Sequence, residues 1–156
     1  MKQGLVIMVA EDDGNDLALL RHAIEQGAKK AGLTITVQAT TDGEEAISYL
    51  SGEGKFANRR IYPFPDIIIL DFKMPRLNGI EVLQWFKNHD EYTRIPKIML
   101  SGSGEIRDVH EAYRLGVNTY FQKPASLEEL RELIYHLLCY WSHTKRSGIR
   151  HAAMRG

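Results

Sequence analysis

The chain is a succession of short apolar runs separated by stretches whose apolar residues recur at helical spacing. Leu5–Ala10 is a continuous apolar run, which is typical of a strand buried on both faces of a sheet. Ile67–Leu70 has the same character. Leu33–Ala39 alternates apolar with polar residues, which predicts a strand at the edge of the sheet with one face more exposed to solvent. Two further runs, Ile95–Leu100 and Thr119–Gln122, complete five predicted strands.

Five helices are predicted after these strands, because apolar residues recur there every three or four positions. Asn15 or Asp16 can cap the first helix, and Ser126 stands three residues before Glu129, the spacing of a capping box at the start of the last. Ser51–Pro65 is predicted to be a loop that is long enough to suggest a functional role. The apolar helical positions are Leu17, Leu20, Ile24 and Ala28; Ala46, Ile47 and Leu50; Ile80, Val82, Leu83 and Phe86; Ile106, Val109, Ala112 and Tyr113; and Leu127, Leu130, Ile134, Leu137, Leu138 and Trp141.

Strands that alternate with helices predict an α/β fold with a parallel sheet and helices on both faces. The length of 156 residues suits one domain. With 20 basic and 20 acidic residues the formal charge is zero, so composition favours neither nucleic acid nor an anionic membrane as a partner. No apolar run approaches the roughly 20 residues of a membrane span, and the single Cys139 favours a reducing compartment. We therefore expect a cytoplasmic protein.

The carboxyl ends of the predicted strands carry reactive or charged residues, and parallel connections bring these ends to one edge of the sheet. Glu11, Asp12 and Asp13 follow the first strand, and Asp71 follows the third. Carboxylates from neighbouring strands repel one another unless a cation neutralises them or their pKa values rise. Because the set has oxygen ligands without histidine or thiolate, Mg²⁺ is the expected cofactor.

The fourth and fifth strands end in groups that suit a phosphoryl group. Ser101 supplies a hydroxyl and Lys123 an ammonium group. Asp71, after the most central apolar strand, is the natural nucleophile toward phosphorus. Each residue alone has an ordinary alternative, such as a helix cap for Asp13 or Asp16, a turn or a surface lysine. Their joint occurrence at four strand ends favours one site.

The motifs at the strand ends resemble those of bacterial response-regulator receiver domains, over residues 5 to about 140. The resemblance implies a flavodoxin-like (βα)5 fold with the five-stranded parallel sheet in the order 2-1-3-4-5, of the stand-alone, chemotaxis-regulator-like kind. It is carried by Val9–Asp16, Pro65–Pro75, Asn78-Gly79, Ser101, Tyr120 and Lys123-Pro124.

The resemblance assigns the metal and phosphoryl site residue by residue. Asp71 matches the phosphoacceptor, Glu11 and Asp12 match the acidic pair, and the main-chain carbonyl of Lys73 would be a further Mg²⁺ ligand. Glu11 stands where the family often has Asp, and its longer side chain is expected to reach the metal through water.

The resemblance also implies a switch. A sensor histidine kinase or phosphotransfer protein would donate a phosphoryl group to Asp71, and Ser101 and Lys123 would contact it. Tyr120 would fill the space that Ser101 leaves, which changes the surface of the fourth helix, fifth strand and fifth helix toward a downstream protein target. Pro124 matches a proline that is typically cis.

The lifetime of the phosphoryl group is expected to depend on Lys73 and Ser103, which flank the reacting residues. Neither can orient a water as a carboxylate or amide would, so self-hydrolysis should be slow. An aspartyl-phosphate phosphatase would carry a second Asp where Lys73 stands, which disfavours an enzyme. An interaction module with a dead site is disfavoured by the intact Asp12, Asp71, Ser101 and Lys123.

A narrower resemblance is to stand-alone regulators of the phytochrome-associated type. It rests on Glu11-Asp12-Asp13, on the extended Ser51–Pro65 loop and on the lack of an output domain. Gly14 departs from it, because those relatives usually carry Pro there.

The C-terminal part raises three expectations. Residues 1–142 are predicted to form the receiver domain, and 143–156 a basic, flexible tail that is too short for a DNA-binding module. Leu133 and Tyr140 form a second apolar line on the last helix, which predicts a possible homodimer through that helix; packing within the monomer is the alternative. A metal site on the same helix is a weaker alternative, carried by His136, Cys139 and His143.

Overall fold

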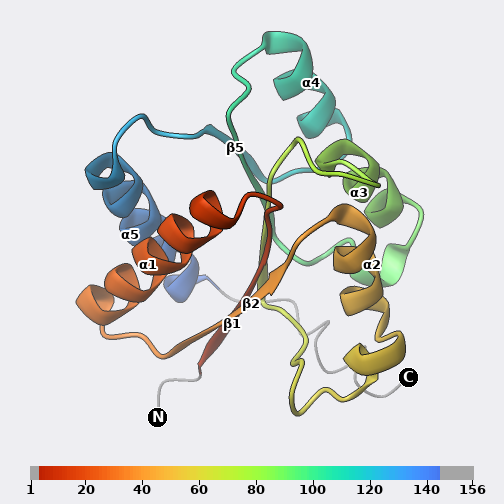
Figure 1. Cartoon of the computed structure of the whole chain (residues 1–156), viewed down its shortest axis with the longest axis horizontal. Helices are drawn as coiled ribbons and strands as arrows, with labels where there is room; N and C mark the ends of the chain where they lie inside the picture. Colours follow the sequence, from red (N-terminus) through yellow and green to blue (C-terminus); the bar gives the residue numbers. More distant parts are fainter. Residues whose placement is uncertain (1–3, 145–156) are drawn as a thin grey trace.

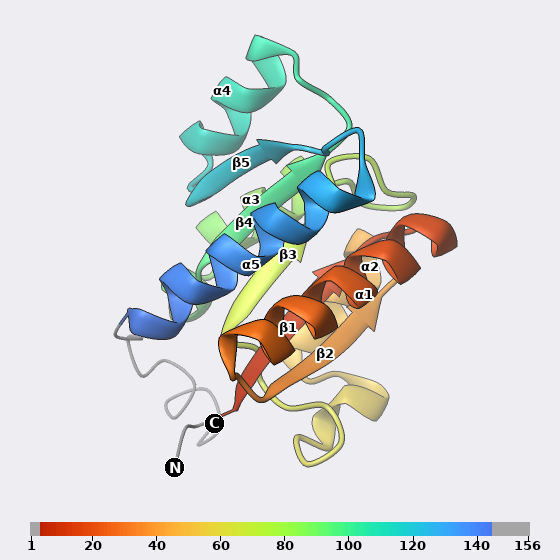
Figure 2. The ribbon, with the colours of Figure 1, turned by 90° about the vertical axis from the view of Figure 1, so that its left-hand side faces the viewer.

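A computed structural model describes residues 4–144 as a five-stranded parallel sheet between two layers of helices (Figures 1 and 2). The sheet order is β2-β1-β3-β4-β5 and every neighbouring pair is parallel, so the predicted α/β fold and strand order are confirmed. The strands are β1 (Leu5–Ala10), β2 (Ile35–Thr40), β3 (Ile67–Leu70), β4 (Lys97–Ser101) and β5 (Thr119–Gln122).

The two faces of the sheet are covered by different helices. Figure 2 shows α1 and α5 side by side on one face, while α2, α3 and α4 lie on the other. Ile7 and Val9 of β1 point into the core under α1 and α5, and Met8 and Ala10 point into the opposite core, as the alternation of side chains along a strand requires. The helices are α1 (Gly14–Ala31), α2 (Gly43–Ser51), α3 (Gly79–Lys87), α4 (Ile106–Arg114) and α5 (Leu127–His143).

Local hydrogen bonds move two element boundaries from their predicted places. Gly32 ends α1 with a positive φ of 68°, a conformation that glycine adopts without strain. Leu33 then donates its N–H to Ala28 O at 2.9 Å, so Leu33 belongs to the helix end and β2 begins only at Ile35. The cap of α1 is Asp13, whose side chain accepts the N–H of Asp16. Of the three residues expected as possible caps, Asp13 is confirmed, and Asn15 and Asp16 are wrong.

The segment predicted as a loop over 51–65 is more ordered than expected. Ser51 is the last residue of α2, and Gly54–Ala57 form a short 3₁₀ helix, η1, whose Phe56 is buried. The Arg59 guanidinium donates to the main-chain carbonyls of Tyr49 and Leu50 at 2.8 and 2.9 Å. Arg59 therefore satisfies carbonyls that the end of α2 would leave without partners. The segment that follows α2 thus stabilises the C-terminal end of this helix.

A second 3₁₀ helix, η2 (Asp90–Tyr92), precedes β4. Ile95 donates its N–H to Tyr92 O and Pro96 has no N–H, so β4 begins at Lys97 and not at Ile95. Within residues 4–144, no helix combines the length and apolarity that crossing a bilayer requires. The predicted basic tail over 143–156 lies, beyond Thr144, outside the described residues.

Candidate phosphoryl and metal site

Three carboxylates meet where β1 and β3 end, next to each other in the sheet. β1 leads directly into Glu11 and Asp12, and β3 leads into Asp71, whose N–H donates to Ala10 O at 3.0 Å. One oxygen of each carboxylate lies within 4.8 Å of one oxygen of the other two. Glu11 and Asp71 are buried, and Asp12 is exposed. This group can bind a hard divalent cation from the solvent side, because carboxylate oxygens are the ligands that Mg²⁺ prefers.

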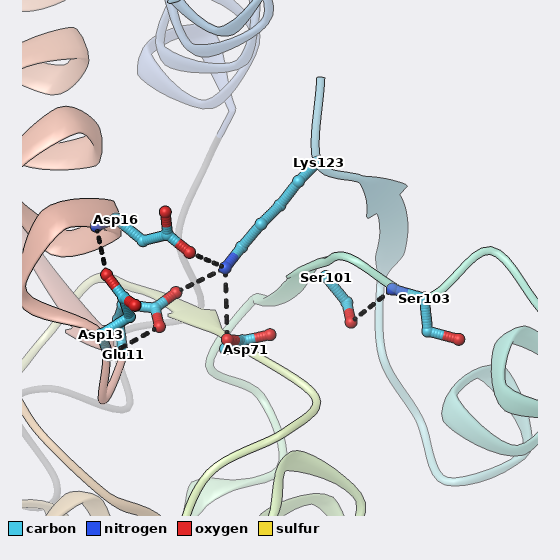
Figure 3. Close-up of polar contacts among 7 residues, drawn as sticks. All are labelled: Glu11, Asp13, Asp16, Asp71, Ser101, Ser103 and Lys123. Carbon is cyan, nitrogen blue, oxygen red and sulfur yellow. Dashed lines mark hydrogen bonds and ion pairs between the residues drawn. The ribbon is translucent and has the colours of Figure 1, made fainter. Parts of the chain in front are cut away.

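A single ammonium group faces these carboxylates from the end of β5. The Lys123 N–H donates to Ser101 O at 2.7 Å, which fixes the start of its side chain beside β4. Its Nζ lies 2.8 Å from Glu11 Oε2, 3.0 Å from Asp16 Oδ2 and 3.2 Å from Asp71 Oδ2 (Figure 3). One cation therefore joins acids from β1, α1 and β3.

The electrostatics of the site show a surplus of negative charge. Burial raises the pKa of Glu11 to about 7, the hydrogen bonds from Lys123 and the Asp13 N–H oppose this rise, and the charge of Asp71 adds to it. Burial alone would lower the pKa of Lys123, but hydrogen bonds to Glu11 and Asp16 and the charge of Asp71 raise it above its usual range. Lys123 is thus a permanent cation, and a bound divalent cation would relieve the remaining repulsion among the acids.

Ser101 lies on the other side of Asp71 from the acids (Figure 3). Its side chain is buried, and its Oγ accepts the N–H of Ser103 at 3.2 Å. Ser103 in turn donates its own hydroxyl to Asp108 Oδ2 at 2.6 Å. The loop after β4 is thereby tied to the first turn of α4.

Tyr120 joins the same loop from β5. Its hydroxyl donates to Ser103 O at 2.7 Å, and its N–H donates to the hydroxyl of Tyr113 on α4 at 3.0 Å. Ser103 thus contacts both residues that the resemblance assigns to the switch, Ser101 through its N–H and Tyr120 through its carbonyl.

Other predicted features fall outside this cluster or differ from expectation. Lys73 is exposed in the loop between β3 and α3. The described part of the chain contains no cis peptide bond, so the prediction of a cis bond before Pro124 is wrong. A trans bond is the lower-energy form by about 0.5–1 kcal/mol, and Lys123 reaches its three partners with it.

The alternative metal site on α5 is not assembled. Among the described residues, Glu11, Asp12 and Asp71 are the one group of three potential ligands close enough to share an ion. His136, Cys139 and His143 are therefore too far apart.

Sequence reasoning missed two features of the site. Asp16 was expected only as a helix cap, yet it is a direct partner of Lys123. Its place in the first turn of α1 gave no signal of this contact, because acids at a helix start are commonly caps. Gly79, the first residue of α3, lies so close to the loop after β3 that a Cβ atom there would collide with Asp71 O. A side chain at this position would displace the backbone that carries Asp71.

Comparisons with known proteins agree with this geometry. The family model of the response regulator receiver domain matches residues 7–135. Response regulator Rcp1 of Synechocystis is 30% identical over 139 residues, which cover 89% of this chain and 90% of Rcp1.

Solved structures agree as well. The phosphorylated cyanobacterial phytochrome response regulator RcpA superposes with a TM-score of 0.82 at 32% identity, covering 92% of this chain and 97% of RcpA. The Mn²⁺-bound form of Rcp1 gives a TM-score of 0.79 at 28% identity, covering 90% and 96%. The parallel β2-β1-β3-β4-β5 sheet, with acids and a lysine at its carboxyl edge, agrees with a receiver domain. This chain belongs to the response regulator receiver domain family.

Proposed function

We propose that this protein is a switch of a two-component phosphorelay that accepts a phosphoryl group on Asp71. The observation that carries the proposal is the 3.2 Å contact between Lys123 Nζ and Asp71 Oδ2 beside two further carboxylates. A sensor histidine kinase or a phosphotransfer protein would be the donor, and a downstream protein would read the result. A cytoplasmic location follows from such partners.

Each residue has a defined task in this reaction. A carboxylate oxygen of Asp71 attacks phosphorus in line, and the donor nitrogen leaves with its bonding electrons. Lys123 offsets the charge on the phosphoryl oxygens, and Ser101 offers a hydroxyl to one of them. Mg²⁺, held by Glu11, Asp12 and Asp71 with the Lys73 carbonyl as a further ligand, would supply charge neutralisation when bound. The Mn²⁺-bound form of the relative Rcp1 supports a divalent cation.

The phosphodonor is proposed to dock on the groove beside the site. A hollow of about 240 Å³ runs from Glu11 and Lys123 between the starts of α1 and α5. The apolar side chains of Leu19 and Leu127 on its rim are 43% and 36% exposed. Exposed apolar residues on the rim of a hollow that is lined by Lys123, the partner of Asp71, favour a protein donor, because a small phosphodonor would not cover them.

The experiment is incubation with acetyl phosphate or phosphoramidate, with and without Mg²⁺, followed by mass spectrometry of the intact protein. We expect one added phosphoryl group that requires Mg²⁺ and is lost in Asp71→Asn. Asp90→Asn, at an exposed aspartate of η2, is the matched control and should react like the natural protein. A full, acid-stable phosphate signal in Asp71→Asn would refute the proposal.

The signal is proposed to leave through α4, β5 and α5. Ser101 would turn from the Ser103 N–H toward the phosphoryl group, and Tyr120, now held on Ser103 O, would follow into the vacated space. The protein would then be a phosphoacceptor with only slow self-hydrolysis. We expect Lys73→Asn and Ser103→Glu to accelerate that hydrolysis, and unchanged rates would contradict this.

We further propose a homodimer through α5. Tyr140 is 66% exposed, and it lines a groove of about 510 Å³ with Leu133, Trp141 and Phe121 of β5. Leu133 also packs partly against the core under α1 and α5. Sedimentation at micromolar concentration should show a dimer that Leu133→Glu or Tyr140→Ala dissolves. A strict monomer, with and without beryllium fluoride as an acyl-phosphate mimic, would eliminate the proposal.

We also propose a division of the chain into two parts. Residues 1–142 would form the receiver domain and 143–156 the tail. The phytochrome-associated relatives support a photoreceptor as one possible origin of the signal, and reconstitution with candidate kinases would identify the donor.

A further inference from the structure

Lys123 has no free donor in this structure. An ammonium group has three N–H donors, and Nζ has three acceptors at 2.8, 3.0 and 3.2 Å, one each on Glu11, Asp16 and Asp71. A phosphoryl oxygen on Asp71 can receive a hydrogen bond from Lys123 only if one of these acceptors gives way. The identity of that acceptor determines how readily Lys123 engages the phosphoryl group.

The three acceptors differ in what their release would cost. The Glu11 carboxylate is buried, and its second oxygen accepts the Asp13 N–H at 3.1 Å; a buried acceptor that loses its donor bears the full desolvation penalty. Asp71 is itself the reacting residue. The Asp16 side chain is 46% exposed, so water can replace Lys123 there at little cost. Asp16 also stands outside the group of carboxylates that are close enough to share a metal ion.

We propose that Asp16 is a positioning residue that competes with the phosphoryl group for Lys123. In the resting protein, Asp16 holds Nζ toward α1; during phosphoryl transfer this contact opens and the freed N–H turns to the phosphoryl oxygen. Removal of the Asp16 charge should therefore speed phosphorylation of Asp71. This inference rests on the proposed phosphoacceptor function.

The same turn of α1 provides a matched control. Asp13 is exposed, carries the same charge and does not contact Lys123 through its side chain. Its Oδ1 caps α1 by accepting the Asp16 N–H at 2.9 Å, and asparagine caps a helix about as well as aspartate. Asp13→Asn thus removes one negative charge near the site and keeps the helix, whereas Asp16→Asn removes the same charge together with the ion pair to Lys123.

The test measures the rate of phosphorylation by phosphoramidate at saturating Mg²⁺ over a range of donor concentrations. Loss of a half-exposed ion pair is expected to change the phosphorylation rate by about two- to fivefold. We therefore expect Asp16→Asn to be phosphorylated faster than Asp13→Asn by that factor. Asp16→Glu should restore the slower rate, because its carboxylate can again reach Nζ. Equal rates for Asp16→Asn and Asp13→Asn, or a slower Asp16→Asn, would overturn the inference.

A second readout does not depend on the reaction. Without Mg²⁺ or donor, the Lys123 ammonium group should give a slowly exchanging ¹⁵N signal by NMR in the natural protein and in Asp13→Asn. In Asp16→Asn that signal should weaken or broaden; an unchanged signal would also overturn the inference. If the natural protein is not phosphorylated at all while the NMR signals differ as expected, the proposed function fails and the ion pair stands, so the two failures are distinguishable.

Discussion

The buried Lys97 allows a quantitative test of the forces that stabilise this fold. Lys97 opens β4 and is 3% exposed. Its Nζ donates to Thr93 O at 2.9 Å and to Ile95 O at 3.0 Å, and lies 4.8 Å from the centroid of the Phe86 ring. No carboxylate pairs with it among the described residues. Burial lowers the pKa of Lys97 from 10.5 to about 8.

The lowered pKa makes stability depend on pH with a definite sign. Below pH 8 the lysine is charged in both states, and the folded state bears the whole cost of burying the charge. Between about pH 8 and 10.5 the unfolded chain holds a proton that the folded protein has lost, so the free energy of unfolding rises with pH. At about 1.4 kcal/mol per pH unit, the total gain is about 3 kcal/mol.

The variant Lys97→Met removes the titration and keeps a similar volume. Two carbonyls lose their donor, which costs about 1 kcal/mol each. At pH 7 the variant should therefore be more stable than the natural protein by about 1 kcal/mol. The reason is that the cost of burying the charge, which the variant avoids, exceeds the free energy of the two lost hydrogen bonds. Near pH 10.5 the order should reverse, because the natural protein then has both the hydrogen bonds and a neutral amine.

Urea unfolding at a series of pH values from 7 to 10.5 measures this difference directly. Other titrating groups cancel when the natural protein and the variant are compared at each pH. Lys29→Met, at an exposed lysine near the end of α1, is the matched control, and its difference from the natural protein should stay constant. A difference for Lys97→Met that does not change with pH would refute the reasoning.

Two further predictions concern Arg59, which stabilises the end of α2, and Gly79, which lies against the backbone of Asp71. Arg59→Ala should lower the free energy of unfolding by about 2–4 kcal/mol, because carbonyls at the end of α2 lose charged donors; Arg60→Ala, at the exposed neighbour, should change it by less than about 0.5 kcal/mol in the same urea experiment. Gly79→Ala should slow phosphorylation of Asp71, since the new methyl group meets Asp71 O; a natural rate with acetyl phosphate would show that the backbone there yields without effect.

Local pattern determined most of the architecture and the residues of the candidate site. The continuous apolar runs before Glu11 and Asp71 are short, which favours buried strands over helices, and parallel connections place their carboxyl ends together. The residues of the candidate site could thus be found before the fold was seen, because they lie at or just after the ends of strands. The edge position of β2 followed from the alternation in its sequence.

Contacts between distant segments were decided only by the tertiary structure. Asp16 and Lys123 lie 107 residues apart, and nothing in the α1 sequence distinguishes an acid that pairs with Lys123 from one that caps the helix, as Asp13 does. The contact of Arg59 with the end of α2 depends in the same way on how the intervening chain packs. Propensity and periodicity act over one or two helical turns. The partner that a side chain at a strand end reaches depends instead on its length and direction in the folded protein. The residues of the site were therefore predictable from the sequence, and their hydrogen bonds and ion pairs were not.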